Sequence, residues 1–155
     1  MRKYHRRFGP STSIIVNDGI IYAYDNGEWG AEVIWRSKYS QPLLHQIYYF
    51  ISKKSNPIKT TQIISDDHLT GFLNTRYGVL GYGGFSHLSI NDGGYVVKFY
   101  KADDIWKSKR IIRTKEHFTS IKESDNGLEL LLGQYSLCSY KYVNKKFIKE
   151  GLVEI

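Results

Sequence analysis

Short runs of alternating apolar and polar residues, separated by tight polar turns, fill most of the chain and predict strands. The fullest unit covers residues 77–100, with a turn at Asn91-Asp92-Gly93 between two strand patterns. The same unit recurs at Asn17-Asp18-Gly19, between residues 14–16 and 20–24, and more loosely at Asp125-Asn126-Gly127. We expect hairpins at all three because these residues tolerate the positive φ of tight turns.

The units extend into meanders. Asp25-Asn26-Gly27 predicts another turn, after which residues 28–36 return as a third strand. Further strands are expected over 43–51, 69–74, 77–82, 117–123, 128–132 and 135–143. Residues 42–52 also fit a short helix, although their β-rich composition favours a strand, and residues 63–72 have room for one helical turn.

A second periodicity joins strand pairs. The apolar residues Trp29, Ile58, Trp106 and Phe147 each follow a short polar turn, and each precedes an apolar pair by five and six residues. Their spacings of 29, 48 and 41 residues fall in the range of repeat proteins and propeller blades. We therefore predict an all-β fold of repeated antiparallel meanders, a partial (half) β-propeller of three to four blades. It is expected to form one domain over residues 1–155, with a basic, frayed N-terminus over 1–12.

Composition agrees with this fold. The chain has 155 residues, of which 41% are hydrophobic and 15% aromatic, enough for one folded domain rich in strand-forming side chains. The single cysteine, Cys138, excludes an internal disulfide framework and is expected as a small packed residue. No apolar run approaches the roughly 18 residues that span a membrane, and we expect a cytoplasmic protein without a membrane partner.

The formal net charge of +7 fits an anionic partner or simple solubility. Basic and aromatic residues interleave at residues 98–101 and 140–142, as they do in proteins that hold single-stranded nucleic acid. The same alternation is equally typical of a half-buried strand. Nucleic-acid binding is therefore an alternative rather than the leading interpretation.

Catalytic and metal-binding patterns are weak. His5 and His45 have no carboxylate or cysteine at a motif spacing, whereas His68 follows Asp66 and Asp67. Capping of a turn by these aspartates is the simpler explanation. His87 and His117 lie in the segments FSHLS and KEHFTS, and no second catalytic group is recognisable for any histidine. The glycines at 78–84 lack the Lys-Ser/Thr of a phosphate loop. We expect no enzyme activity, no metal and no cofactor.

Protein binding requires only a rigid scaffold and anchors on one rim. Acidic residues concentrate in predicted turns, and aromatic residues beside charge make effective anchors. If alternate turns gather at one end of the sheets, that rim is locally acidic despite the basic total. The predicted partner-binding residues are Tyr24, Asp25, Glu28, Trp29, Asp66, Asp67, His68 and Asp92.

The segments IIYAYDNGEWGAEVIW (20–35) and GFSHLSINDGGYVVKFYKADDIW (84–106) resemble blades of small bacterial β-propeller proteins. Many proteins of that style are immunity proteins of polymorphic toxins, including contact-dependent growth-inhibition toxins. The resemblance implies a protein that covers the active site of a cognate toxin domain, as a monomer or a 1:1 complex. It shares no functional motif residue by residue. The alternatives are a basic nucleic-acid-binding module or small RNase toxin, and, from the density of tyrosine and tryptophan, a glycan-binding lectin.

Overall fold

The computed structural model describes residues 9–38, 61–87, 90–132 and 136–154. These residues form twelve strands and one short 3₁₀ helix, so the predicted all-β fold of antiparallel meanders is confirmed. The strand expected over 43–51, the anchor Ile58 and the start of the basic N-terminus lie outside the described residues. Among those that are described, no helix is long and apolar enough to cross a lipid bilayer.

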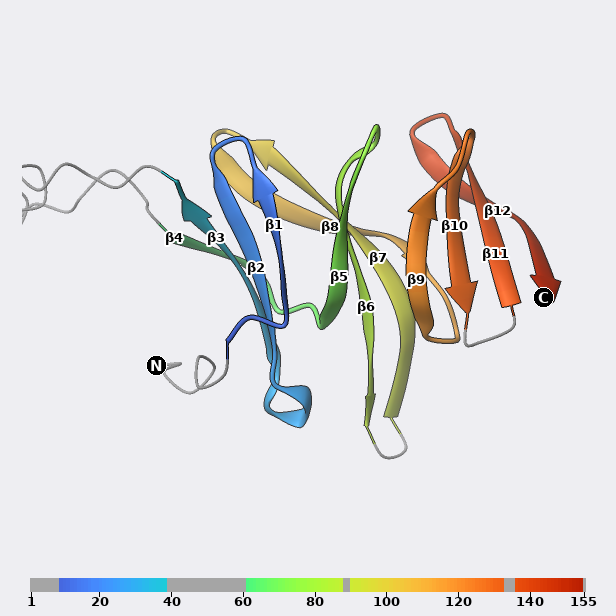
Figure 1. Cartoon of the computed structure of the whole chain (residues 1–155), viewed down its shortest axis with the longest axis horizontal. Coiled ribbons are helices and arrows are strands. Elements are labelled where there is room, and N and C mark those ends of the chain that lie inside the picture. Colours follow the sequence, from blue (N-terminus) through green and yellow to red (C-terminus); the bar gives the residue numbers. More distant parts are fainter. Residues whose placement is uncertain (1–8, 39–60, 88–89, 133–135, 155) are drawn as a thin grey trace, which may run out of the picture.

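The strands form three four-stranded antiparallel sheets, each built from consecutive strands (Figure 1). The first sheet contains β1 (Thr12–Val16), β2 (Gly19–Asp25), β3 (Ala31–Ser37) and β4 (Thr61–Ser65). The middle sheet contains β5 (Leu69–Thr75), β6 (Gly78–His87), β7 (Ile90–Ala102) and β8 (Ile105–Arg113). The last sheet contains β9 (Phe118–Glu123), β10 (Gly127–Leu132), β11 (Ser136–Val143) and β12 (Lys146–Glu154).

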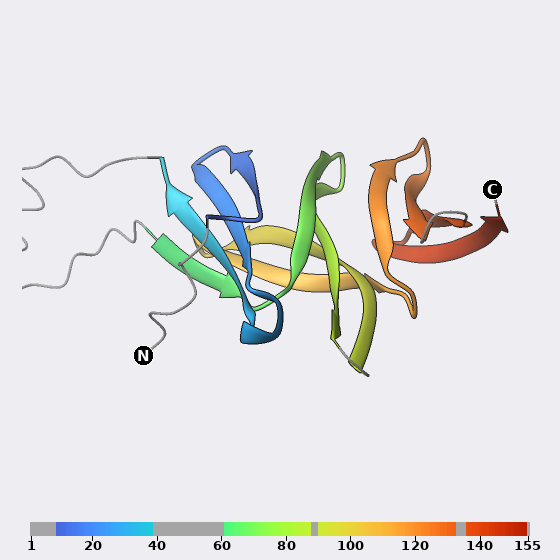
Figure 2. The same cartoon turned by 60° about the horizontal axis from the view of Figure 1, so that its bottom comes forward.

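The three sheets lie side by side in chain order, as Figures 1 and 2 both show. One apolar core fills the space between the first and middle sheets, and a second fills the space between the middle and last sheets. Strand β7 serves both cores, because successive side chains of a strand point to opposite faces. Tyr95 and Val97 enter the first core and Val96 enters the second, and all three are at most 1% exposed. Cys138 is packed in the second core, as expected.

Two of the three predicted Asn/Asp-Gly turns are confirmed. Val16 pairs with Gly19 across Asn17-Asp18, and β10 begins at Gly127. The glycines are required for a different reason from the one expected, since neither has a positive φ. A Cβ atom on Gly19 would lie 2.0 Å from the carbonyl oxygen of Arg36, and one on Gly127 would lie 1.8 Å from that of Tyr140. The third strand of each meander passes too close for any side chain.

The prediction of a turn at Asn91-Asp92-Gly93 is wrong. All three residues lie inside β7, where Asn91 pairs with Ser86, and the hairpin closes nearer to the N-terminus of that strand. Gly93 has a φ of +68° beside an irregularity in the β6–β7 register, so it forms a bulge in a continuous strand. The Asn-Asp-Gly pattern correctly indicates a glycine with an unusual backbone conformation, but that glycine forms a bulge and not a turn.

Two expectations near Trp29 and after Ile63 also need correction. Residues 27–29 form the 3₁₀ helix η1 (Gly27–Trp29), and the third strand begins only at Ala31. The reason is local: Oδ1 of Asp25 accepts the N–H of Gly27 at 2.9 Å, which folds the chain into a turn. Residues 63–72 comprise the end of β4, a loop at 66–68 and the start of β5, and they contain no helical turn.

The predicted anchors are only partly equivalent. Trp106 pairs with Lys101 and Phe147 pairs with Tyr142, each one pair beyond a two-residue turn, so these two residues hold matching positions. Trp106 is 8% exposed. Trp29 lies in η1 instead and is 75% exposed, because the Asp25 turn expels it from the sheet. The described residues therefore form three meanders, but the predicted anchor residues do not occupy equivalent positions in all of them.

Candidate functional site

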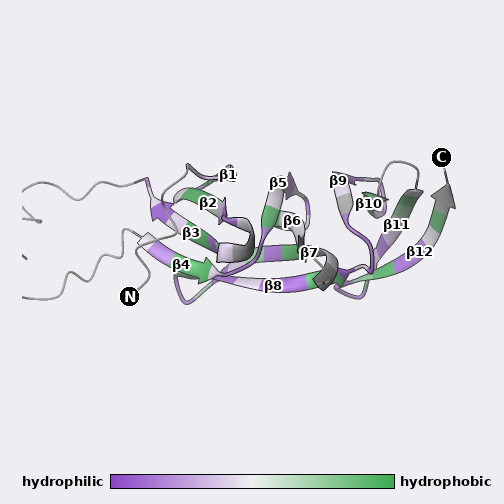
Figure 3. Ribbon diagram, turned by 90° about the horizontal axis from the view of Figure 1, so that it is seen from below, coloured by the Kyte–Doolittle hydropathy of each residue, from purple (hydrophilic) through white to green (hydrophobic). Residues whose placement is uncertain are grey.

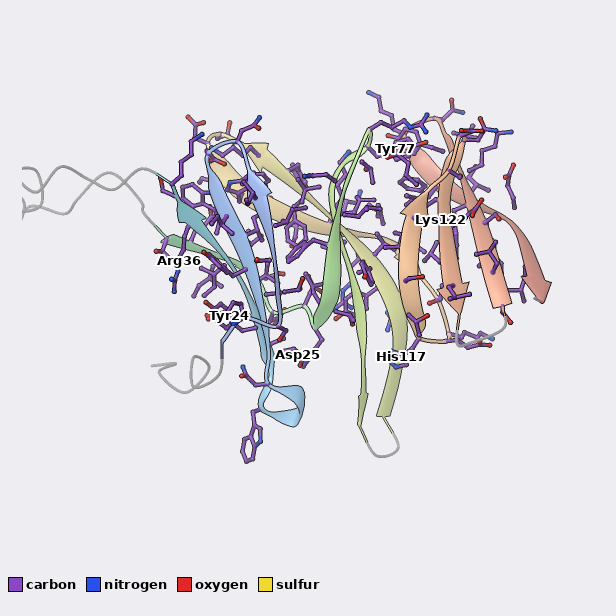
Figure 4. The ribbon with its side chains drawn as sticks, in the orientation of Figure 1. Tyr24, Asp25, Arg36, Tyr77, His117 and Lys122 are labelled. Atoms are coloured by element: carbon purple, nitrogen blue, oxygen red, sulfur yellow. The ribbon has the colours of Figure 1, made fainter. Side chains whose placement is uncertain are left out.

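The predicted binding residues gather mainly where two loops of the first and middle sheets meet. Asp25 ends β2 and Trp29 lies in the β2–β3 connection, while the β4–β5 loop contains Asp66, Asp67 and His68. We call residues 24–30 and 66–68 the rim. Figure 4 shows Tyr24 and Asp25 at this end of the strands of the first sheet, while Tyr77, between β5 and β6, lies at the opposite strand end. The rim thus lies far from the β1–β2 and β5–β6 turns.

Asp25 joins the two loops of the rim. Its Oδ1 atom lies 2.9 Å from Nδ1 of His68, 43 residues away in the chain. The same oxygen accepts the N–H of Gly27, and the backbone N–H of Asp25 donates to Oγ of Ser11 at 2.9 Å. One aspartate therefore fixes the 3₁₀ turn, the β4–β5 loop and the entry to β1.

The 3₁₀ turn presents Trp29 to solvent. The N–H of Asn26 donates to the carbonyl of Gly30 at 3.0 Å, and the N–H of Gly30 donates to Gly27 at 3.1 Å, which closes the loop on itself. Glu28 is the middle residue of this turn. The backbone of Trp29 is held by hydrogen bonds while three quarters of its surface stays exposed.

Two predicted rim residues are buried. Asp67 is 5% exposed, and its Oδ1 accepts Nε–H of Arg110 at 2.8 Å. The guanidinium of Arg110 lies 4.1 Å from the centre of the Tyr95 ring. Tyr24 is 6% exposed. Asp67 and Tyr24 therefore support the rim from below, and Asp66 remains on its surface.

The predicted residue Asp92 is not part of the rim loops. It lies in β7, where the expected turn does not exist. Acidic residues of the other turns, Asp18, Asp103 and Asp104, belong to the opposite end of the sheets. Alternate turns of a meander lie at alternate ends, so the acidic turn residues are divided between the two ends of the sheets.

Sequence reasoning missed Tyr95, which supports the β4–β5 loop. Its hydroxyl accepts the N–H of His68 at 2.8 Å and donates to the carbonyl of His68 at 3.1 Å. Burial raises the pKa of Tyr95 to about 12, with the nearby carboxylate of Asp67 acting in the same direction. No local pattern announces this role, since the partners are 27 residues apart.

Metal chemistry finds no support at the rim. Across residues 9–38, 61–87, 90–132 and 136–154, no group of three or more His, Cys, Asp or Glu side chains is arranged to hold a metal ion. The rim instead combines the exposed ring of Trp29 with neighbouring polar and charged residues that are held by hydrogen bonds. Such an arrangement suits binding by surface contact.

Comparison of the chain with models of protein families, with curated proteins and with solved structures finds no match in any of the three.

Proposed function

We propose that this protein is a non-enzymatic binding protein whose rim grips a protein partner. The partner suggested by the resemblance of residues 20–35 and 84–106 to propeller blades is a bacterial toxin domain, which the rim would cover in the manner of an immunity protein. In this proposal the three sheets are blades of a partial β-propeller. The chain acts in the cytoplasm, as a monomer that forms a 1:1 complex.

The exposure of Trp29 carries the proposal. Of the three tryptophans, Trp35 and Trp106 are 9% and 8% exposed, whereas Trp29 is 75% exposed. A large aromatic side chain loses water-contacting apolar surface when a partner covers it, and tryptophan is the residue most enriched in binding hot spots. The same burial of Trp35 and Trp106 weakens the glycan-binding alternative, which depended on the density of aromatic residues.

The surround of Trp29 supports the same function. Asp25, Asp66 and His68 provide a polar border that a partner can hydrogen-bond. Tyr95 and the buried Asp67–Arg110 pair hold that border in place. A surface that is already ordered loses less conformational entropy on binding, which favours affinity.

Binding to the product of the neighbouring gene tests the proposal, which predicts that this product contains a toxin domain. The full chain and that domain are co-expressed and copurified, and affinity is measured by isothermal titration calorimetry. We expect a 1:1 complex of micromolar or tighter affinity, weakened by Trp29→Ala by about 2 kcal/mol or more. Ile15→Ala is the matched control, because Ile15 is 74% exposed but belongs to β1, away from the rim.

Two results would defeat the proposal. The first is the absence of a complex together with no protection of cells that express the toxin domain. The second is a complex that Ile15→Ala weakens as much as Trp29→Ala does. In the second case the partner binds elsewhere on the protein.

A further inference from the structure

A cleft of about 270 Å³ opens between the middle and last sheets, away from the rim. Four lysines line it: Lys98 and Lys109 from β7 and β8, and Lys145 and Lys146 from the turn between β11 and β12 and the start of β12. Arg110 lines it as well, although its Nε–H is already directed at Asp67. Figure 3 shows hydrophilic residues in the middle part of β8. No carboxylate of a described residue lines this cleft.

The four cleft lysines differ from four other lysines of the described chain that form ion pairs. Lys101, Lys107, Lys122 and Lys141 each lie 2.7 to 4.0 Å from a carboxylate. In the described part of the chain, none of the cleft lysines has such a partner. Positive charge therefore concentrates in the cleft without internal neutralisation. Its neutralisation is left to solvent ions or to a ligand.

Two features of the cleft cost stability. Lys98 and Lys109 stand directly opposite each other in the β7–β8 pairing, and like charges at such positions are destabilising. Lys145 has a φ of +63°, a conformation that glycine adopts without strain and lysine does not. Asp104 has a similar positive φ at the matching turn of the middle sheet, so the Lys98–Lys109 pair is the unfavourable feature that distinguishes the cleft, and such local conflicts are expected where a site binds something.

Aromatic side chains complete the lining. Tyr142 and Phe147 are half-buried, and their ring centres lie 4.8 Å apart. Proteins that hold single strands of nucleic acid combine a positively charged groove with aromatic rings on which bases stack. The cleft is too small for a folded partner to enter, and a single nucleotide of a chain suits its size and composition.

We propose that this cleft binds single-stranded nucleic acid, with phosphates held by the cleft lysines and a base placed against Tyr142 and Phe147. The proposal concerns a surface separate from the rim and does not depend on the proposed toxin partner. An acidic protein segment shares the negative charge but not the flat rings, so it serves as the competing ligand in the test.

The test is fluorescence anisotropy with a labelled single-stranded RNA of about 12 nucleotides and mixed sequence, at about 50 and about 200 mM salt. We expect the wild-type chain to bind at the lower salt. The double variant Lys98→Gln, Lys146→Gln should bind at least about tenfold more weakly, with a salt slope smaller by about 1.4. The matched control is Lys122→Gln, Lys141→Gln, which removes the same charge from two residues of the last sheet that do not line the cleft and should change affinity by less than about twofold.

Two substitutions to glycine distinguish an effect on RNA binding from an effect on stability. Lys145→Gly relieves the positive φ, so it should raise the melting temperature while weakening RNA binding severalfold. Asp104→Gly makes the same change at the matching turn of the middle sheet, where φ is +57°, and should raise the melting temperature without weakening binding. Trp29→Ala should leave RNA binding unchanged, so failure at the rim and failure at the cleft are distinguishable.

Four results would overturn the proposal. They are no binding by the wild-type chain at the lower salt, equal weakening by the control pair, competition by polyglutamate as effective as by RNA, and competition by an RNA duplex as effective as by the single strand. The last two would reassign the cleft to acidic protein or to phosphate alone.

Discussion

Nζ of Lys101 lies 2.7 Å from Oδ2 of Asp18, an ion pair that joins the β7–β8 hairpin of the middle sheet to the β1–β2 turn of the first. The same carboxylate oxygen accepts the indole N–H of Trp106 at 3.4 Å. Arg76 performs the corresponding task at the next junction, where its guanidinium donates to Glu123 and to the carbonyls of Ser124 and Asp125. Each of the two junctions between neighbouring sheets therefore has an apolar core. Each also has a set of polar contacts, which we call a clamp, and both clamps lie at the same end of the strands.

The Asp18 clamp predicts a pH-dependent stability. Burial opposes ionisation of Asp18, but the hydrogen bond and charge of Lys101 outweigh it and hold its pKa below the ordinary value. A carboxyl whose pKa is lower in the folded state stabilises that state above the unfolded pKa of about 3.9, and the contribution disappears as the pH falls through the folded pKa. Asp18→Asn should therefore lower the free energy of unfolding by about 1 kcal/mol near neutral pH and by less in acid.

Urea denaturation at neutral pH and at about pH 3 measures this difference. Asp104→Asn is the control, because the carboxylate of Asp104 is fully exposed and lies 3.9 Å from the same lysine. It should change stability by less than about 0.5 kcal/mol at either pH. An equal loss for Asp18→Asn at both pH values would show that its charge does not matter.

Tyr95→Phe should destabilise the protein through the β4–β5 loop. It removes both hydrogen bonds to the partly buried backbone of His68, at a cost of about 1–3 kcal/mol. Because the pKa of Tyr95 is raised to about 12, wild-type stability should fall as the pH rises above about 10, where an unfolded tyrosine ionises. The variant should lose less stability over this range. Chemical denaturation at intervals through the alkaline range checks both effects, and identical alkaline profiles would contradict the second.

Gly127→Ala tests the close approach of three strands in the last sheet. The added methyl group would lie 1.8 Å from the carbonyl oxygen of Tyr140, so the backbone must move, and we expect a loss of about 1–3 kcal/mol or more. Gly151→Ala, in the same sheet, is the matched control because nothing lies within 4 Å of its added carbon. Thermal unfolding of both variants gives the comparison. Equal melting temperatures would show that the meander can relax around a side chain.

The strands and most of the turns could be predicted because they depend on short-range sequence patterns. Features that depend on pairing between distant residues could not be predicted. The β-rich run of residues 20–24 and the mostly apolar run of 128–132 identify strands, and each places side chains in a core. The Asn91-Asp92-Gly93 signal fails because the chain continues β7 through a bulge, a choice that depends on pairing with β6. At the rim, sequence could identify Trp29 as a large residue near a turn but not its exposure. The contacts of Asp67 and His68 with Arg110 and Asp25 each span 43 residues, and no local pattern encodes them.

The two equivalent hairpin turns predict stabilising substitutions. Asp103-Asp104 and Asn144-Lys145 all have φ between +50° and +63°, the left-handed region that is natural for both central residues of a tight hairpin turn. Glycine is favoured at the second position, and a side chain there costs roughly 1 kcal/mol. Lys145→Gly and Asp104→Gly should therefore each raise the free energy of unfolding by about 0.5–1 kcal/mol, measured by urea denaturation at neutral pH. Lys145→Asn should give a smaller gain, because asparagine tolerates this conformation less well than glycine but better than lysine. A loss of stability in both glycine variants would mean that the turns hold these side chains through contacts stronger than the backbone strain.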